Sequence, residues 1–152
     1  PHITNEIKRF IYNVGKKTNA DVVITEIGGT IGDIESQPFI EAARQVQLEV
    51  GKENSLFIHV TLVPYLHGSE EHKTKPTQHS VKELQGMGVN PNIIILRCDE
   101  PLESSIFDKI SLFCNVKRDC VIENITLPNL YEAPLMLEKA NFSAVVCREL
   151  GI

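Results

Sequence analysis

The stretch NPNIIILRCDE, Asn90 to Glu100, decides the fold class of this chain. Pro91 leads into a continuous aliphatic run, Ile93 to Leu96, and a charged loop follows it. An apolar run without polar alternation is typical of a strand that is covered on both faces, as strands of parallel sheets are. We therefore start from a buried strand that ends in a charged loop.

Three more stretches, on both sides of this centre, predict strands of the same sheet. They are ADVVITEI, SLFIHVTLVPY and CVIEN, at residues 20–27, 55–65 and 120–124. Their β-branched and aliphatic residues favour the pleated, buried environment of a sheet. We expect them to run parallel to the central strand.

Helices are predicted between the strands. Apolar residues recur at helical spacing in residues 1–17, with Thr4 as the N-cap and Gly15 as the stop. Further helices are expected at 36–51, 77–88, 104–114 and in the region punctuated by Pro128 and Pro134. Alternation of helices and strands predicts an α/β fold, with a mostly parallel sheet and crossover helices.

Size, charge and cysteines limit the class of protein. The 152 residues have the length of one domain, and no apolar run approaches the roughly 20 residues that cross a bilayer, so a soluble chain is expected. The same observation means that no membrane is an expected partner, and a formal net charge of -5 repels polyanions, so no nucleic acid is expected either. Cysteines at 98, 114, 120 and 147 have apolar neighbours and no Cys-x-x-Cys spacing. Buried free thiols in a reducing cytoplasm are therefore expected, rather than disulfides or a zinc site.

The first candidate site is the acidic loop EIGGTIGDIES, Glu26 to Ser36. Its glycines let backbone approach a ligand closely, and Glu26 at a strand end is a hard oxygen ligand that suits Mg²⁺ on a phosphate. The other interpretation is a polar turn with solvated acids. Ligands of open parallel sheets bind beyond the carboxyl ends of the strands. The loops that begin at Glu26, Tyr65 and Arg97 should therefore meet at one edge.

The second candidate site is the loop HGSEEHKTKPTQHS, residues 67–80. Lys73 and Lys75, with Thr77 and Gln78, come just before a predicted helix, and this combination suits an anion such as phosphate. An exposed charged loop with Thr77 as a mere N-cap is the alternative. An acidic metal loop opposite a basic phosphate loop is typical of phosphoryl transfer.

Other polar residues are less specific. Lys109 lies between apolar helix positions, which by itself indicates a solvated helix face, and Arg97 either faces a phosphate or pairs with Asp99. The chain has neither a Gly-x-x-x-x-Gly-Lys-Ser/Thr loop nor a Gly-x-Gly-x-x-Gly loop. It therefore lacks a triphosphate cradle of the usual sort.

Four motifs together resemble the synthetase (amidoligase) domain of the CTP synthase family. They are EIGGTIGDIES.PF.EA.RQ, TLVPY, KTKPTQHSVKEL..MG..P and FCNV, and the similarity runs along essentially the whole chain. The resemblance implies a partial amidoligase domain at residues 1–152, of the P-loop NTPase-like (dethiobiotin-synthetase-like) type. Its phosphate-loop strand and first magnesium aspartate would precede Pro1, and its glutaminase domain would follow Ile152.

The resemblance also implies an activity for the parent enzyme. Members of the family convert UTP to CTP in the cytoplasm: ATP phosphorylates the uracil 4-oxygen, and glutamine-derived ammonia displaces that phosphate. Mg²⁺ is the implied cofactor, CTP the feedback inhibitor, and a homotetramer the implied assembly. Two alternatives stay open: an isolated nucleotide-binding and oligomerisation module without activity, or a regulatory relative of phosphate-loop ATPases that performs no amide chemistry.

Site residues follow from the resemblance position by position. Glu26 and Lys73 match catalytic positions, and Glu26 also matches a magnesium ligand. The positions that match the UTP or CTP site are Asp33, Ile34, Glu35, Lys73, Thr74, Lys75, Pro76, Thr77, Gln78 and Lys109. Ile125, Thr126 and Leu127 match a segment beside the ATP adenine, but their side chains differ from the family pattern, so contacts there would be mainly backbone. The 73–78 segment would reach a nucleotide that is bound largely by a neighbouring subunit.

Overall fold

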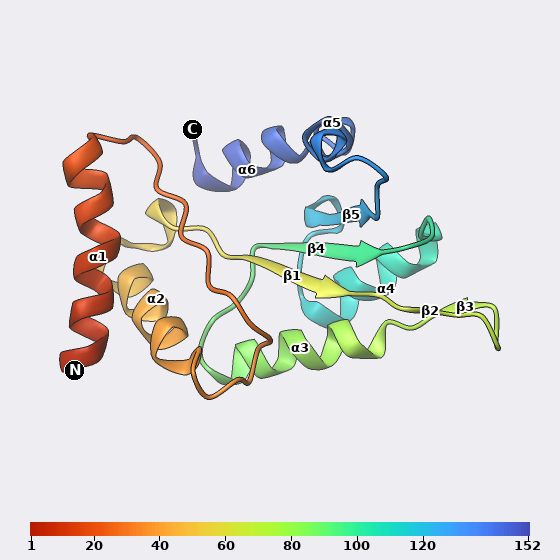
Figure 1. Cartoon of the computed structure of the whole chain (residues 1–152), viewed down its shortest axis with the longest axis horizontal. Coiled ribbons are helices and arrows are strands. Elements are labelled where there is room, and N and C mark those ends of the chain that lie inside the picture. Colours follow the sequence, from red (N-terminus) through yellow and green to blue (C-terminus); the bar gives the residue numbers. More distant parts are fainter.

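The computed structural model describes all of residues 1–152 and has an α/β fold built on a parallel sheet (Figure 1). The strands β1 (Ile58–Leu62), β4 (Ile93–Cys98) and β5 (Val121–Ile125) form a three-stranded sheet in the order β1-β4-β5. Both pairs are parallel, with Ile58 beside Ile93 and Cys98 beside Ile125. The predicted parallel sheet with crossover helices is thereby confirmed.

Six α-helices accompany the sheet. They are α1 (His2–Thr18), α2 (Gln37–Val50), α3 (Lys75–Gly86), α4 (Ser104–Cys114), α5 (Ala133–Lys139) and α6 (Phe142–Leu150). Three short 3-10 turns occur at Lys52–Asn54, Arg118–Cys120 and Leu130–Glu132. In Figure 1, α3 and α4 lie on one side of the sheet, α5 and α6 on the other, and α1 and α2 pack together at one end of the molecule.

The core forms around β4, the strand with the continuous aliphatic run. Ile93, Ile94 and Leu96 are fully buried, although neighbouring side chains of a strand point to opposite faces. Ile110 of α4 and Val145 of α6 belong to the same apolar cluster. The prediction of a strand covered on both faces is therefore confirmed for β4.

The predicted strand at residues 20–27 is wrong. This segment is an irregular connection between α1 and α2, and Ile24 is 92% exposed. A strand requires a hydrogen-bonded neighbour, and β1 pairs on one side only, with β4. Ile58, Val60 and Leu62 of this edge strand are also exposed. One edge of the sheet is thus open and apolar.

The ends of α1 also differ from the prediction. Thr4 is not the N-cap, because the helix begins at His2 and the Thr4 hydroxyl donates to the Pro1 carbonyl at 3.1 Å. Gly15 does not stop the helix, which continues to Thr18 and ends at Asn19 in the left-handed conformation. Asparagine tolerates that conformation and so replaces glycine as the terminator. The predicted boundaries of α2, at Ser36 and Gly51, are confirmed.

A small hairpin was absent from the sequence prediction. Its strands β2 (Tyr65–Leu66) and β3 (Glu71–His72) form an antiparallel pair that extends away from the body of the molecule (Figure 1). The Tyr65 ring packs edge-on against His72, with 4.9 Å between ring centroids.

No helix of the chain is long and apolar enough to cross a membrane.

Candidate functional site

The KTKPTQ segment forms the turn before α3 and the first turn of that helix. Lys73 follows β3 directly, and α3 begins at Lys75 with Pro76 in its first turn, where a missing amide hydrogen costs nothing. Lys75 and Pro76 are exposed, whereas Thr74, Thr77 and Gln78 are buried. The segment therefore has a charged outer side and a polar inner side.

Hydrogen bonds hold the inner side of the segment. The Gln78 side-chain amide donates to the Thr74 hydroxyl at 3.0 Å, and the Thr77 hydroxyl lies 2.9 Å from that of Thr61 on β1. Thr77 does not act as the N-cap: that position belongs to Thr74. Sequence reasoning missed Thr61 as a partner of this segment. Its only signal was a hydroxyl group in a strand whose other residues, apart from His59, are apolar.

Lys73 is partly neutralised within the chain. Its ammonium group pairs with the carboxylate of Glu71, two residues earlier in the chain. Hydrogen bonding from Lys73 lowers the pKa of Glu71, so this carboxylate is charged at neutral pH. A phosphate that binds Lys73 must compete with Glu71 for the ammonium group.

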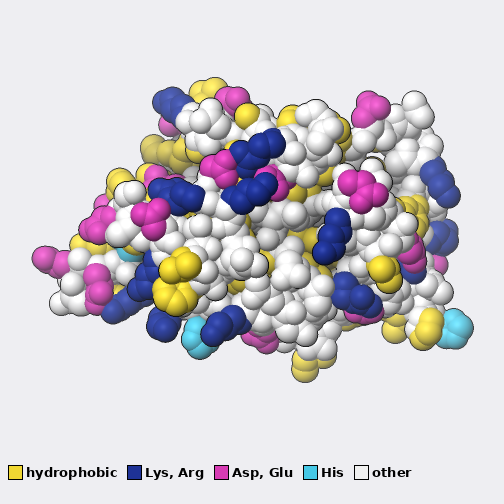
Figure 2. Space-filling view, turned by 180° about the vertical axis from the view of Figure 1, so that it is seen from behind, with side chains coloured by type: hydrophobic (Ala, Val, Ile, Leu, Met, Phe, Trp, Pro, Cys, Tyr) yellow, Lys and Arg dark blue, Asp and Glu magenta, His cyan; other side chains and the backbone are white.

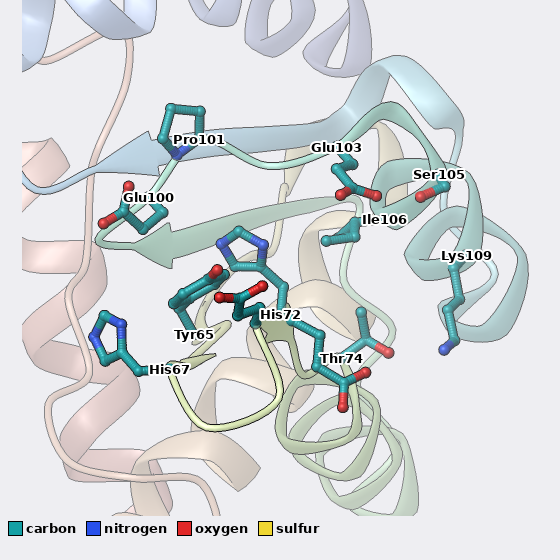
Figure 3. Close-up of a pocket in the computed structure, with 12 residues that line it drawn as sticks. Tyr65, His67, His72, Thr74, Glu100, Pro101, Glu103, Ser105, Ile106 and Lys109 are labelled. Atoms are coloured by element: carbon teal, nitrogen blue, oxygen red, sulfur yellow. The ribbon is translucent and has the colours of Figure 1, made fainter.

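A cavity of about 610 Å³ lies between the hairpin and the start of α4 (Figure 3). Thr74 and Lys109 line it together with the rings of Tyr65, His67 and His72. Four carboxylates belong to the same lining: Glu70, Glu71, Glu100 and Glu103. Lys109 has no ion-pair partner in the chain, so its ammonium group is free to meet a ligand from the open side.

The acidic loop is a compact turn. Asp33 accepts a hydrogen bond from the Thr30 amide at 2.9 Å, and its own carbonyl accepts one from the Ser36 hydroxyl at 2.9 Å. Gly32 has a φ of 97°, and a Cβ there would lie 2.6 Å from an oxygen of Glu83 on α3. Ile34 is 84% exposed at the tip, and Glu35 beside it is exposed. The predicted residues of this loop therefore face solvent.

Glu26 is exposed beside Gly28 and makes no hydrogen bond or ion pair within the chain. No three His, Cys, Asp or Glu side chains come close enough to hold a metal ion. A free carboxylate is nevertheless a suitable single oxygen ligand for Mg²⁺, which usually keeps waters and substrate phosphates as its other ligands. Glu26 fits such a role as one member of a shared ligand set.

The expected meeting of the three loops is only partly correct: the loops that begin at Tyr65 and Arg97 line one cavity together, whereas the acidic loop is not part of its lining. Arg97 pairs with Asn124 in the sheet register, so the end of β4 lies beside residues 125–127. Thr126 donates its hydroxyl to Asp99 at 2.7 Å, and Arg97 forms no ion pair with that carboxylate. Ile27 of the acidic loop instead packs with the small cluster that includes Leu84, in the C-terminal half of α3. The acidic loop and the KTKPTQ segment therefore contact opposite halves of one helix.

The cysteines carry free thiols. Burial raises the pKa of Cys98 to about 12 and that of Cys114 to about 11, so both are uncharged and unreactive at neutral pH. Cys147 is exposed, which corrects the expectation that all the thiols are buried.

Charged side chains of both signs are interspersed on the face in Figure 2, in keeping with a modest net charge.

Comparison with known proteins decides the family. A family model described as CTP synthase N-terminus matches residues 1–152. The chain belongs to the CTP synthase family. It is 59% identical to a CTP synthase of Ruminiclostridium cellulolyticum and 55% identical to one of Bacillus subtilis, in each case over 152 residues. These residues are 100% of this chain but 28% of either CTP synthase, so the chain spans little more than a quarter of the length of these relatives.

A more distant relative gives the same result. The CTP synthase of Halalkalibacterium halodurans is 51% identical over 152 residues, which are 29% of that protein. CTP synthases of three different organisms are thus 51% to 59% identical to this chain over its whole length.

Proposed function

We propose that this chain is part of the amidoligase domain of a CTP synthase, whose parent converts UTP to CTP with ATP and glutamine-derived ammonia. The observation that carries the proposal is the match of the whole chain to the CTP synthase N-terminus family model, and the KTKPTQ segment supports it by presenting its lysines on its outer side. Buried polar contacts hold its inner side, so its lysines project from a fixed turn. Such a turn suits a nucleoside triphosphate.

Lys73 and Lys75 would bind the triphosphate of UTP or CTP, together with main-chain amides at the start of α3. Ammonium groups offset the negative charge of phosphates, and the first amides of a helix have no partner within the helix. Lys109 would add a further cation from α4. Asp33, Ile34 and Glu35 would meet the pyrimidine end, which accords with their exposure in the acidic loop.

The acidic loop and the KTKPTQ segment lie at opposite halves of α3, and this separation supports nucleotide sites shared between subunits of a homotetramer. One subunit would supply the acidic loop and its neighbour the KTKPTQ segment.

Glu26 would hold Mg²⁺ as one carboxylate ligand of a shared set. When bound, the ion offsets charge on the phosphate oxygens of the transferred group. Glu26 itself needs only to stay ionised and accessible, and its free, exposed carboxylate meets both conditions.

Ile125, Thr126 and Leu127 would lie beside the ATP adenine. The Thr126 amide donates to the Cys98 carbonyl at 2.9 Å, and its hydroxyl donates to Asp99. The amide and hydroxyl hydrogens of Thr126 are therefore both engaged. Recognition of adenine there would use the main chain of the neighbouring residues.

The open edge of β1 would receive the phosphate-loop strand of the parent. Two features support this assignment: the edge has no hydrogen-bonded neighbour, and the apolar side chains of Ile58, Val60 and Leu62 are exposed beside it. A strand inserted there would cover apolar surface and complete a triphosphate cradle that this chain lacks. The parent would also contain the glutaminase domain and act in the cytoplasm.

The isolated chain is expected to be an inactive nucleotide-binding and oligomerisation module. We would supply UTP, ATP, Mg²⁺ and ammonium chloride to the 152-residue chain and, in parallel, to the full-length gene product. Ammonium chloride replaces the glutaminase domain, so the assay reports only the synthetase chemistry. We expect CTP from the full-length protein and none from the isolated chain.

The two outcomes that count against the proposal are distinct. CTP formation by the 152-residue chain would show that the module is active by itself. Absence of CTP with the folded full-length protein would contradict the assignment of the parent as a CTP synthase.

A further inference from the structure

Helix α3 is joined to β1 by hydroxyl groups as well as by apolar contacts. Thr61 is 6% exposed and Thr77 is 0% exposed, and their hydroxyl oxygens lie 2.9 Å apart. Burial of a hydroxyl group is unfavourable unless a hydrogen bond replaces its contact with water. This pair therefore satisfies itself inside the helix–sheet interface.

The direction of the hydrogen bond follows from the neighbouring contact. The Thr77 hydroxyl donates to the carbonyl of Leu62 at 3.1 Å. A hydroxyl group has one hydrogen, so Thr77 can only accept from Thr61. The result is a chain of two bonds, from Thr61 to Thr77 and on to the Leu62 carbonyl, which we call the threonine relay.

The threonine relay fixes the base of the KTKPTQ turn. Thr77 is the third residue of α3, and the relay connects it to the last two residues of β1. At the other end of the turn, the Lys73 amide donates to the Pro64 carbonyl at 2.9 Å. The turn is thus anchored to one strand and its continuation, at both of its ends.

Directional bonds specify this placement more sharply than apolar contacts do. Apolar contact tolerates small shifts between a helix and a sheet, whereas a hydrogen bond weakens steeply as its distance and angle depart from the ideal. Small shifts at the base of the turn would move the ammonium groups of Lys73 and Lys75. Their positions relative to a phosphate therefore depend on the relay.

We propose that Thr61 is a positioning residue for nucleoside triphosphate binding, acting through Thr77 on the lysines of the KTKPTQ segment. This inference rests on the proposed function. Thr61 itself does not touch the nucleotide, and Thr77, which matches a nucleotide-binding position, acts from inside the fold. Loss of the Thr61 hydroxyl should weaken UTP binding selectively.

The test uses the full-length enzyme with Thr61→Val, which removes the hydroxyl at nearly constant volume. We expect the UTP concentration for half-maximal rate to rise about three- to tenfold, the range for one lost hydrogen bond. The ATP requirement and kcat should change by less than about twofold, because the same bond does not support the ATP segment. Calorimetric titration with UTP, without ATP, should give the same ratio.

Three further variants make the result specific. Thr61→Ser keeps the donor and should restore wild-type UTP dependence. Thr4→Val makes the same chemical change on α1, far from the segment, and should leave both nucleotide requirements unchanged. If Thr61→Val does not fold, Thr61→Ala removes the hydroxyl without introducing a methyl group in its place, and the same measurements apply.

Two results would overturn the inference. One is an unchanged UTP requirement in a folded variant without the hydroxyl. The other is an equal rise in the UTP and ATP requirements with a lowered Tm, which indicates a general structural role. Failure of the wild-type protein to form CTP is a separate result that refutes the proposed function instead.

Discussion

Lys73 illustrates how a single residue combines a structural and a functional contact. Its ammonium group pairs with Glu71 in the free chain, yet the same group matches a catalytic position of the family. An exposed ion pair of this kind contributes little to stability. Its displacement by a phosphate is therefore easy.

We expect Lys73→Ala to raise the UTP requirement of the full-length enzyme by roughly tenfold or more, because hydrogen bonds to charged groups are the stronger ones. The ATP requirement should stay within about twofold. Initial rates measured with each nucleotide varied in turn give both values. Lys82→Ala is the matched control, since Lys82 is an exposed lysine on the same helix, outside the segment. Equal effects on both nucleotides would count against a specific role in UTP binding.

His59 makes stability depend on pH. Its Nε2 lies 2.8 Å from the Ser80 hydroxyl, and burial lowers its pKa from the ordinary value of 6.5. Between the lowered pKa and 6.5, the unfolded chain binds more protons than the folded chain. The free energy of unfolding therefore falls as the pH drops below 6.5, and this loss ends once the pH is below the folded pKa.

Thermal unfolding of the full-length protein checks this effect. Acidification from about pH 7.5 to about pH 5.5 should lower Tm less in His59→Gln than in the wild type, because the substituted side chain does not titrate. His79→Gln, at an exposed position of α3, should retain the wild-type dependence. Identical pH dependence in all the proteins would refute the role of His59.

At the scale of elements, the sequence prediction succeeded where the residue pattern of one segment is enough to decide between helix and strand. The aliphatic run of β4 requires cover on both faces, and the pattern of residues 104–114 matches α4. The prediction of a strand at residues 20–27 was wrong because a strand also needs a hydrogen-bonded neighbouring strand, and sequence periodicity does not reveal whether one is present. The hairpin was missed because each of its strands has only two residues.

The candidate site shows the same limit. The motif located the KTKPTQ segment correctly at the start of α3, but residue types alone did not reveal that Thr77 and Gln78 point inward. Hydroxyl and amide groups can hydrogen-bond equally well to a ligand or to a residue inside the protein. For Thr77, only the position of Thr61 opposite its hydroxyl group shows that the partner is internal.

The open edge of β1 leads to a prediction about this strand. A chain extended to include the proposed phosphate-loop strand should have a Tm several degrees above that of the 152-residue chain, because the new strand would hydrogen-bond to the open edge of β1 and shield part of the exposed Val60 and Leu62 side chains. An extension of equal length built from glycine and serine is the control. Differential scanning calorimetry of the three chains gives the comparison, and equal Tm values for both extensions would exclude strand insertion.

At the scale of the whole molecule, α3 connects two parts of different chemistry. The acidic loop contacts its C-terminal half through Glu83 and the cluster around Leu84, while the KTKPTQ segment forms its N-terminal end. Twelve residues of α-helix span about 18 Å, so the two parts lie at opposite ends of one continuous helix.

In the proposed tetramer, α3 would join parts of two different nucleotide sites. A nucleotide at one site that favours one placement of α3 would favour the same placement at the other site. Binding events at two sites are then thermodynamically linked, and the linkage is reciprocal: each site alters the affinity of the other by the same factor. The separation of the two loops along α3 would thus give the proposed assembly a route to cooperative binding of nucleotide.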